Sequence, residues 1–224
     1  VSLPDFNLNK RNEIKDLNFI NRATKGVYEF GSVFKTFTFA AALQEKKIDL
    51  DTKFEKLEKK IWCAGNPISE YDYDIPSTLT AEEILIRSSN VGSVVLAQKI
   101  GVRKYKEFIE KTALTENPNI ELEEIGTPHK IKWNRCKLET ISFGHGITTT
   151  PLQATALYAS MVNGGKMITP SLIQKKNKKQ SERIVSKETS RKLASILRKV
   201  VSSEEGTASL ADKNGYFVGG KTGT

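Results

Sequence analysis

The sequence predicts an α+β fold, with helices packed beside a sheet that includes the last segment of the chain. Two patterns favour this class. Apolar residues recur mostly at the spacing of helices, whereas residues 216–222 form a strand pattern that contains glycines. The chain has 224 residues, no internal repeat and no low-complexity tract, so we expect one domain with its own hydrophobic core.

The first predicted helix covers residues 32–44 and follows Gly31. Phe34, Phe37 and Ala41 recur at helical spacing within a mostly apolar segment, which predicts a helix buried on most sides. Its first residue is polar.

A capping box predicts the next helix. Thr80 is followed three residues later by Glu83, so the two residues can cap each other's backbone N–H groups. We expect this helix to be interrupted by residues 88–90 (SSN) and by Gly92. A second helical stretch, residues 94–100, then stops at Gly101.

Two longer helices are predicted in the C-terminal half. Thr150 is a cap with Pro151 at the first helical position, and this helix ends at residues 163–165 (NGG). Ser186 caps an amphipathic helix whose apolar residues continue to Val201.

The last predicted element is a strand. Asn214 and Gly215 indicate a turn, and residues 216–222 (YFVGGKT) follow it as a strand whose glycines allow a close approach of another backbone or a ligand.

The composition is that of an ordinary globular protein, with 38% hydrophobic and 27% charged residues. No stretch approaches the roughly 18 apolar residues that a membrane helix needs, and residues 1–4 do not begin a secretion signal. We therefore expect a soluble stretch, with any targeting segment outside it.

The net charge of +9 does not by itself indicate a nucleic-acid partner. Much of the excess lies in residues 175–183 (KKNKKQSER), which contain no aromatic side chain on which a base could stack. We expect a solvated loop and no nucleic acid. Attraction to anionic lipid or to a wall polymer is the minor alternative.

The two cysteines, Cys63 and Cys136, are too few for a disulfide scaffold and lack the spacing of metal ligands. Their residue type favours two unpaired, partly buried thiols. No metal or cofactor is expected.

Ser32 and Lys35 are the first candidates for catalysis. Residues three apart lie on one face of a helix, so the amine can reach the hydroxyl. A lysine with a lowered pKa can accept the hydroxyl proton, and the helix N-terminus favours the developing negative charge. Alone the pair is weak evidence, because a capped helix with a surface lysine has the same pattern.

Two further motifs carry suitable polar groups. Residues 88–90 (SSN) place hydroxyls and a carboxamide at a break between helices, where side chains can point into a cleft. Residues 221–224 (KTGT) add a cation and hydroxyls on the predicted strand. A polar helix break and an edge strand with a solubilising lysine are the ordinary explanations.

In this order the three motifs match the signature of penicillin-binding proteins and serine β-lactamases. Over nearly its whole length, the chain resembles the class B penicillin-binding proteins, which are monofunctional peptidoglycan D,D-transpeptidases. One departure is Phe30, where members of the family commonly have proline. The similar blocks are residues 28–35, 88–92, 143–146, 150–153, 206–208 and 215–216.

The resemblance implies the helix-rich penicillin-binding transpeptidase fold. In that fold the helix of Ser32 lies between a helical region around Ser88 and the sheet that carries the strand of Lys221. Residues 1–224 would form one transpeptidase domain truncated at both ends, with an incomplete sheet, because domains of the family begin earlier and continue further.

The resemblance also implies acyl transfer from a terminal D-alanyl-D-alanine. Ser32 would attack the carbonyl, Lys35 would act as the base, and Ser88 would relay a proton to the leaving amine. Backbone N–H groups of Ser32 and Thr224 would hold the oxyanion. The implied substrate-binding residues are Asn90, Lys221, Thr222, Gly223 and Thr224.

The implied partners are peptidoglycan stem peptides, β-lactam antibiotics, a glycosyltransferase and other division proteins. The implied location is the outer, periplasmic face of the cytoplasmic membrane, through an anchor outside this sequence. Division is favoured over elongation through the resemblance alone.

Two other functions compete with this one. A serine β-lactamase would need a base for deacylation, for which the candidates are Glu116, Glu121, Glu123 and Glu124. A penicillin sensor or an idle division scaffold would use the same fold only for binding. The two histidines, His129 and His145, receive no role.

Overall fold

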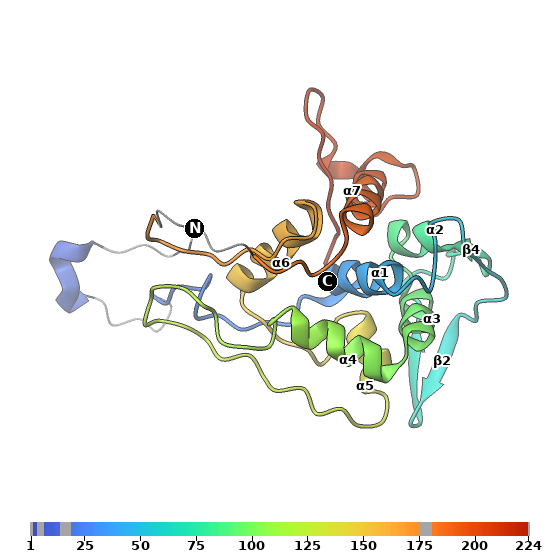
Figure 1. The fold of residues 1–224 in the computed structure, drawn as a ribbon, viewed down its shortest axis with the longest axis horizontal. Coiled ribbons are helices and arrows are strands. Elements are labelled where there is room, and N and C mark those ends of the chain that lie inside the picture. The colour runs from blue at the N-terminus through green and yellow to red at the C-terminus, as the bar shows by residue number, and fades with distance from the viewer. Residues whose placement is uncertain (1, 4–6, 14–18, 175–180, 224) are drawn as a thin grey trace.

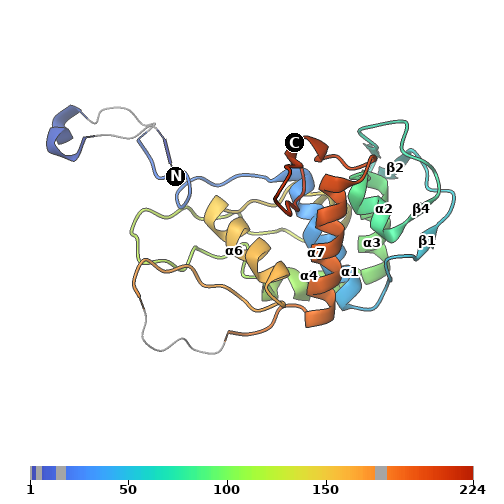
Figure 2. The same cartoon turned by 90° about the horizontal axis from the view of Figure 1, so that it is seen from above.

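A computed structural model describes the chain except for residues 1, 4–6, 14–18, 175–180 and 224 (Figures 1 and 2). The α-helices in the described residues are α1 (Lys35–Gln44), α2 (Ala81–Ile86), α3 (Asn90–Ile100), α4 (Val102–Lys111), α5 (Lys137–Ser142), α6 (Pro151–Val162) and α7 (Lys187–Ser202). Short 3-10 helices are η1 (Leu8–Glu13), η2 (Gly31–Phe34) and η3 (Ser209–Ala211). The strands are β1 (Lys53–Phe54), β2 (Lys60–Cys63), β3 (Asn66–Ser69) and β4 (Leu79–Thr80).

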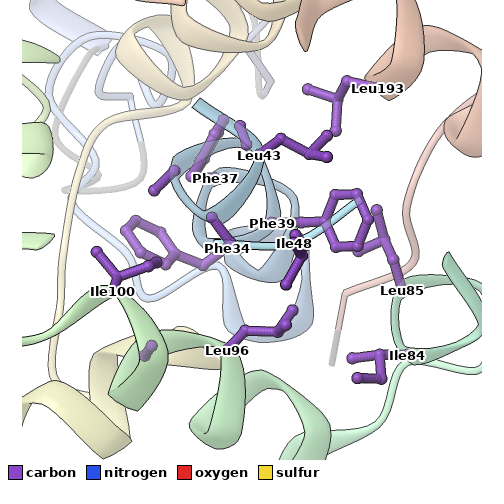
Figure 3. Packing of buried hydrophobic residues seen from close by; sticks show 14 of the residues in the cluster. Phe34, Phe37, Phe39, Leu43, Ile48, Ile84, Leu85, Leu96, Ile100 and Leu193 are labelled. Atoms are coloured by element: carbon purple, nitrogen blue, oxygen red, sulfur yellow. The ribbon is translucent and has the colours of Figure 1, made fainter. Parts of the chain in front are cut away.

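Helix α1 lies at the centre of the hydrophobic core, with α2, α3, α4 and α7 around it. Figure 3 shows its side chains directed at Leu85 of α2, Leu96 of α3 and Leu193 of α7. Every residue from Lys35 to Leu43 is buried, as expected of a mostly apolar helix that other helices surround. The predicted helix is confirmed, with its first turn formed by η2.

The predicted caps are also present. The Thr80 hydroxyl accepts the N–H of Glu83, whose carboxylate accepts the N–H of Thr80 at 2.7 Å. Thr150 caps α6, which has proline at its first position, and Ser186 caps α7.

The interruption predicted at residues 88–90 and at Gly92 is shorter than expected. Helix α3 begins at Asn90, so the break covers only residues 87–89, and Gly92 lies inside the helix. A Cβ atom on Gly92 would lie 2.7 Å from the Ile84 side chain. Glycine at this position therefore lets α3 pack closely on α2 and does not end a helix.

The described strands form two small antiparallel sheets. Strand β1 pairs with β4, and β2 pairs with β3 in a hairpin that aligns Lys60 with Ser69. Together with the helices, these sheets make the fold α+β, as predicted.

The prediction of a strand at residues 216–222 is wrong, because these residues form no strand, although the turn at Asn214 and Gly215 is present. No described strand lies beside this segment. The segment is hydrogen-bonded to α7 instead: the N–H of Gly220 donates to the Leu197 carbonyl at 3.0 Å. Figure 2 shows the segment running past α7 to the beginning of α1.

The prediction of two unpaired thiols is wrong as well, because Cys63 and Cys136 form a disulfide. Cys63 ends β2, and Cys136 directly precedes α5. The bond therefore joins the β2–β3 hairpin to the segment that leads into α5. The two cysteines are 73 positions apart, so their pairing could not be read from the sequence. It depends on how the hairpin and the segment before α5 pack in the folded chain.

Most of the positively charged run lies outside the described residues, which include only residues 181–183 of it. Among the described helices, none has the length and apolar character required to cross a membrane.

Candidate active site

A cavity of about 620 Å³ lies at the N-terminal end of α1. Segments that are far apart in the sequence meet there. The lining residues are Glu29, Gly31, Ser32, Tyr71, Ser88, Asn90, Phe143, Gly144, His145, Thr207 and Thr222. Of the predicted site residues, Ser32, Ser88, Asn90 and Thr222 thus face one space.

Ser32 is held in η2, directly before α1. The preceding Gly31 has a positive φ of 51° and is in close contact with Gly144. A Cβ atom on Gly144 would lie only 2.0 Å from the carbonyl oxygen of Gly31. The loop after α5 therefore packs directly on the backbone that precedes Ser32.

Lys35, the first residue of α1, is only 1% exposed. Its Nζ atom donates to the Ser88 carbonyl and, at 3.1 Å, to the Ser88 hydroxyl. Burial, and to a smaller extent the positive charge of Lys221, lowers the pKa of Lys35 to about 7, while the charge of Glu70 acts in the opposite direction. A large fraction of the amine is consequently neutral at pH 7 and able to accept a proton.

The Ser88–Asn90 turn brings the second motif to the same place. Ser88 is buried and has a φ of 59°, a left-handed conformation that is uncommon outside glycine. The Ser89 hydroxyl caps α3 by accepting the N–H of Gly92. The Asn90 amide donates to the Ser69 carbonyl at 2.8 Å, which fixes the side chain at the wall of the cavity.

The C-terminal segment supplies the third motif. The Lys221 amine donates to the Thr222 hydroxyl at 3.1 Å, and this hydroxyl lies 2.9 Å from that of Thr207. Burial lowers the pKa of Lys221 to about 8. A Cβ atom on Gly223 would lie 2.8 Å from the Val33 side chain, so this segment lies against η2. Thr224 lies outside the described residues.

Several lining residues received no role in the sequence analysis. The Glu29 carboxylate accepts the N–H of Gly146 at 3.0 Å and lies 3.3 Å from Nδ1 of His145. The His145 ring stacks on Phe143 with an interplanar angle of 8°. Glu29 and residues 143–146 lie in blocks that resemble the penicillin-binding proteins, and this resemblance could have indicated that they line the site. Nothing in the sequence marked Tyr71.

The four glutamates considered as deacylation bases do not line this cavity. Glu121 accepts hydrogen bonds from Ser171 and Leu172, and Glu124 accepts the N–H of Asn21. Among the described residues, no cluster of His, Cys, Asp and Glu side chains could hold a metal ion.

The chain matches, over residues 1–224, the family described as the penicillin binding protein transpeptidase domain. A probable peptidoglycan D,D-transpeptidase FtsI of Caulobacter vibrioides is 33% identical over 100% of this chain and 38% of its own length. Stage V sporulation protein D of Bacillus subtilis is 34% identical over 88% of this chain and 32% of its own length. The chain thus spans about a third of the length of these curated relatives.

Solved structures are similar too. A crystal structure described as a peptidoglycan glycosyltransferase from Burkholderia ambifaria superposes with a TM-score of 0.84 at 25% identity, over 92% of this chain and 66% of that one. The TP domain of penicillin-binding protein 3 from Burkholderia pseudomallei gives a TM-score of 0.83 at 25% identity, over 91% and 62%.

Proposed function

Because this chain belongs to the penicillin-binding protein transpeptidase domain family, we propose that its full-length protein is a peptidoglycan D,D-transpeptidase that works through an acyl-enzyme on Ser32. The observation that carries the proposal is the buried amine of Lys35, which contacts Ser88 at the edge of the cavity that Ser32 lines. Such an amine can activate a neighbouring hydroxyl without a metal or cofactor.

In the proposed reaction, the Ser32 oxygen attacks the carbonyl of the terminal D-alanyl-D-alanine bond while neutral Lys35 takes its proton. The backbone N–H groups of Ser32 and Thr224 stabilise the oxyanion. The C–N bond then breaks, Ser88 relays a proton to the leaving D-alanine, and an ester remains on Ser32. The amine of a second stem peptide attacks the ester, releases Ser32 with its proton and forms the cross-link.

The remaining motif residues are the proposed substrate-binding residues. Lys221 is the proposed anchor for the substrate carboxylate, together with the backbone and hydroxyls of Thr222, Gly223 and Thr224. Asn90 would hold the peptide backbone. The two lysines suit different roles, because the pKa of Lys35 is about 7 and that of Lys221 about 8. At neutral pH Lys221 is mostly charged, whereas a large part of Lys35 is not.

We extend the proposal to inhibitors, partners and location. β-Lactams would acylate the same serine. A glycosyltransferase and other division proteins would act with the full-length protein at the outer, periplasmic face of the cytoplasmic membrane. This part rests on the resemblance to class B penicillin-binding proteins, and support comes from the family and from relatives named as peptidoglycan D,D-transpeptidases and penicillin-binding proteins. Septal localisation of a fluorescent fusion in dividing cells would test it.

Mass spectrometry of the full-length protein after treatment with a penicillin tests the chemistry. We expect one adduct, on the peptide that contains Ser32, together with cross-linking of a D-alanyl-D-alanine donor to an amine acceptor. Ser32→Ala should abolish both. Ser209→Ala, at an exposed serine of η3, is the matched control and should change neither.

The stability of the adduct separates the alternatives. An adduct that lasts for hours fits a transpeptidase, whereas rapid turnover of the penicillin would identify a β-lactamase. A protein with a stable adduct but no cross-linking, whose Ser32→Ala variant still supports division, would be a sensor or scaffold. An adduct on a different serine would contradict the proposed nucleophile.

A further inference from the structure

Glu70 is a buried carboxylate outside the three motifs. It directly follows β3 and is only 6% exposed. A buried charge destabilises a protein unless hydrogen bonds or an opposite charge compensate for its lost hydration. The groups that bond to Glu70 therefore indicate what this residue does.

Among the described residues, the Glu70 carboxylate accepts its hydrogen bonds from residues 89–91, at the turn of the second motif and the start of α3. Its Oε2 atom accepts the N–H of Asn90 at 2.7 Å, and its Oε1 atom accepts the N–H of Val91 at 3.2 Å and the hydroxyl of Ser89. The Ser89 oxygen also accepts the N–H of Gly92 at 2.8 Å, so its own proton points to Glu70. Every donor thus faces an acceptor.

These bonds satisfy groups that α3 itself leaves open. Asn90 and Val91 are its first two residues, whose N–H groups have no carbonyl partner within the helix. A negative charge at this end is favourable because the helix dipole is positive there. Glu70 consequently ties the start of α3 to the end of β3.

This connection reaches Lys35 through Ser88. Both the carbonyl and the hydroxyl of Ser88 accept hydrogen bonds from the Lys35 amine. Ser88 holds a left-handed φ of 59°, which persists only where the surroundings impose it. The three anchored residues that follow Ser88 provide that constraint.

We propose that Glu70 is a positioning residue for acyl transfer, which holds the Ser88–Asn90 turn in the geometry that Lys35 and the substrate need. This inference rests on the proposed transpeptidase function. In the described part of the chain, the hydrogen bonds of the Glu70 carboxylate go to residues 89–91 and not to Ser32 or Lys35, so Glu70 acts through the turn.

The negative charge of Glu70 also affects the pKa of Lys35, and this gives a second measurable effect. Among the described residues, the charged groups that act on the Lys35 amine are Lys221 in the C-terminal segment, which lowers its pKa, and Glu70 after β3, which raises it. Replacing Glu70 by neutral glutamine should therefore lower the pKa of Lys35 further. A residue that only stabilises the fold at a distance would leave this pKa unchanged.

The test is Glu70→Gln in the full-length protein, with Glu58→Gln as the control. Glu58 is exposed, and its replacement removes the same charge from the segment before the hairpin. We expect Glu70→Gln to slow acylation by a penicillin at least about tenfold, which corresponds to losing one hydrogen bond to a charged group. The acid limb of the pH profile should move to lower pH. Glu58→Gln should change neither.

Amide hydrogen exchange gives a readout that does not need activity. In Glu70→Gln the N–H groups of Asn90 and Val91 should exchange faster, while that of Gln153, in the first turn of α6, should not. If the wild-type protein is not acylated, the proposed function fails, and the exchange measurement still decides whether Glu70 holds the turn.

Unchanged exchange at Asn90 and Val91 together with an unmoved acid limb would overturn the inference. If Glu70→Gln does not fold, Ser89→Ala tests the same anchor, because it removes one donor to Glu70 and the acceptor of Gly92. Its acylation rate, measured per folded molecule, should fall about tenfold; an unchanged rate would overturn the inference in that case.

Discussion

The Nζ atom of Lys35 lies 3.1 Å from the hydroxyl oxygen of Ser88, although 53 positions separate the two residues. The same amine also donates to the Ser88 carbonyl. Two motifs of the sequence therefore meet in one hydrogen-bonded unit, beside the cavity that Ser32 and Thr222 line. The expected behaviour of variants follows from the burial of this unit and from its charges.

Lys35→Ala should slow acylation of the full-length protein by a penicillin by about 10²- to 10⁴-fold, the usual contribution of a general base. The reason is that Lys35 is the proposed acceptor of the Ser32 proton, and among the described residues no other amine is hydrogen-bonded to Ser88. Stopped-flow measurement of the acylation rate checks this. Lys187→Ala is the control, because Lys187 is likewise the first residue of a helix but is exposed. Equal rates for both variants would exclude Lys35 as the base.

The pH dependence of acylation should be bell-shaped. Lys35 acts when neutral, so the rate should rise with pH through about 7. Lys221 binds the carboxylate when protonated, so the rate should fall again above about 8. Second-order rate constants between about pH 5.5 and 9.5 test both limbs. Lys221→Ala should weaken acylation and remove the alkaline limb, and a limb that persists in this variant would assign it to another group.

The disulfide between Cys63 and Cys136 should stabilise the domain. Closing a loop of 73 residues removes about 4 kcal/mol of chain entropy from the unfolded state in the entropic treatment of cross-links. The double variant Cys63→Ser and Cys136→Ser should therefore unfold at a lower urea concentration than the oxidised protein. The reduced wild type is the control and should match the double variant. Identical midpoints with and without reductant would contradict this expectation.

Gly144→Ala should impair both folding and acylation. Its φ of +91° strains any other residue, and the added Cβ would meet the Gly31 carbonyl at 2.0 Å. Gly65→Ala is the matched control, because Gly65 has a φ of +83° with nothing within 4 Å. We expect only the strain of about 1–2 kcal/mol at Gly65. At Gly144 the loss of stability should be larger, and acylation should slow as the backbone before Ser32 shifts. Thermal unfolding and acylation rates of the two variants make the comparison.

Local sequence was sufficient for several elements. The caps at Thr80, Thr150 and Ser186 are bonds between residues three apart, so the sequence alone predicts where α2, α6 and α7 begin. Likewise, the apolar run after Ser32 predicted a buried α1 without knowledge of its neighbours. The three motifs indicated the chemistry through residue type and order.

Tertiary structure decided the rest. The pairing of Cys63 with Cys136, the bonds of Glu70 to the turn, and the attachment of residues 216–222 to α7 all join segments that are distant in the sequence. The pKa of Lys35 belongs to this group, because burial is its largest cause. Interactions within one helical turn depend on neighbouring residues alone. Burial and long-range bonds depend on which segments the folded chain brings together.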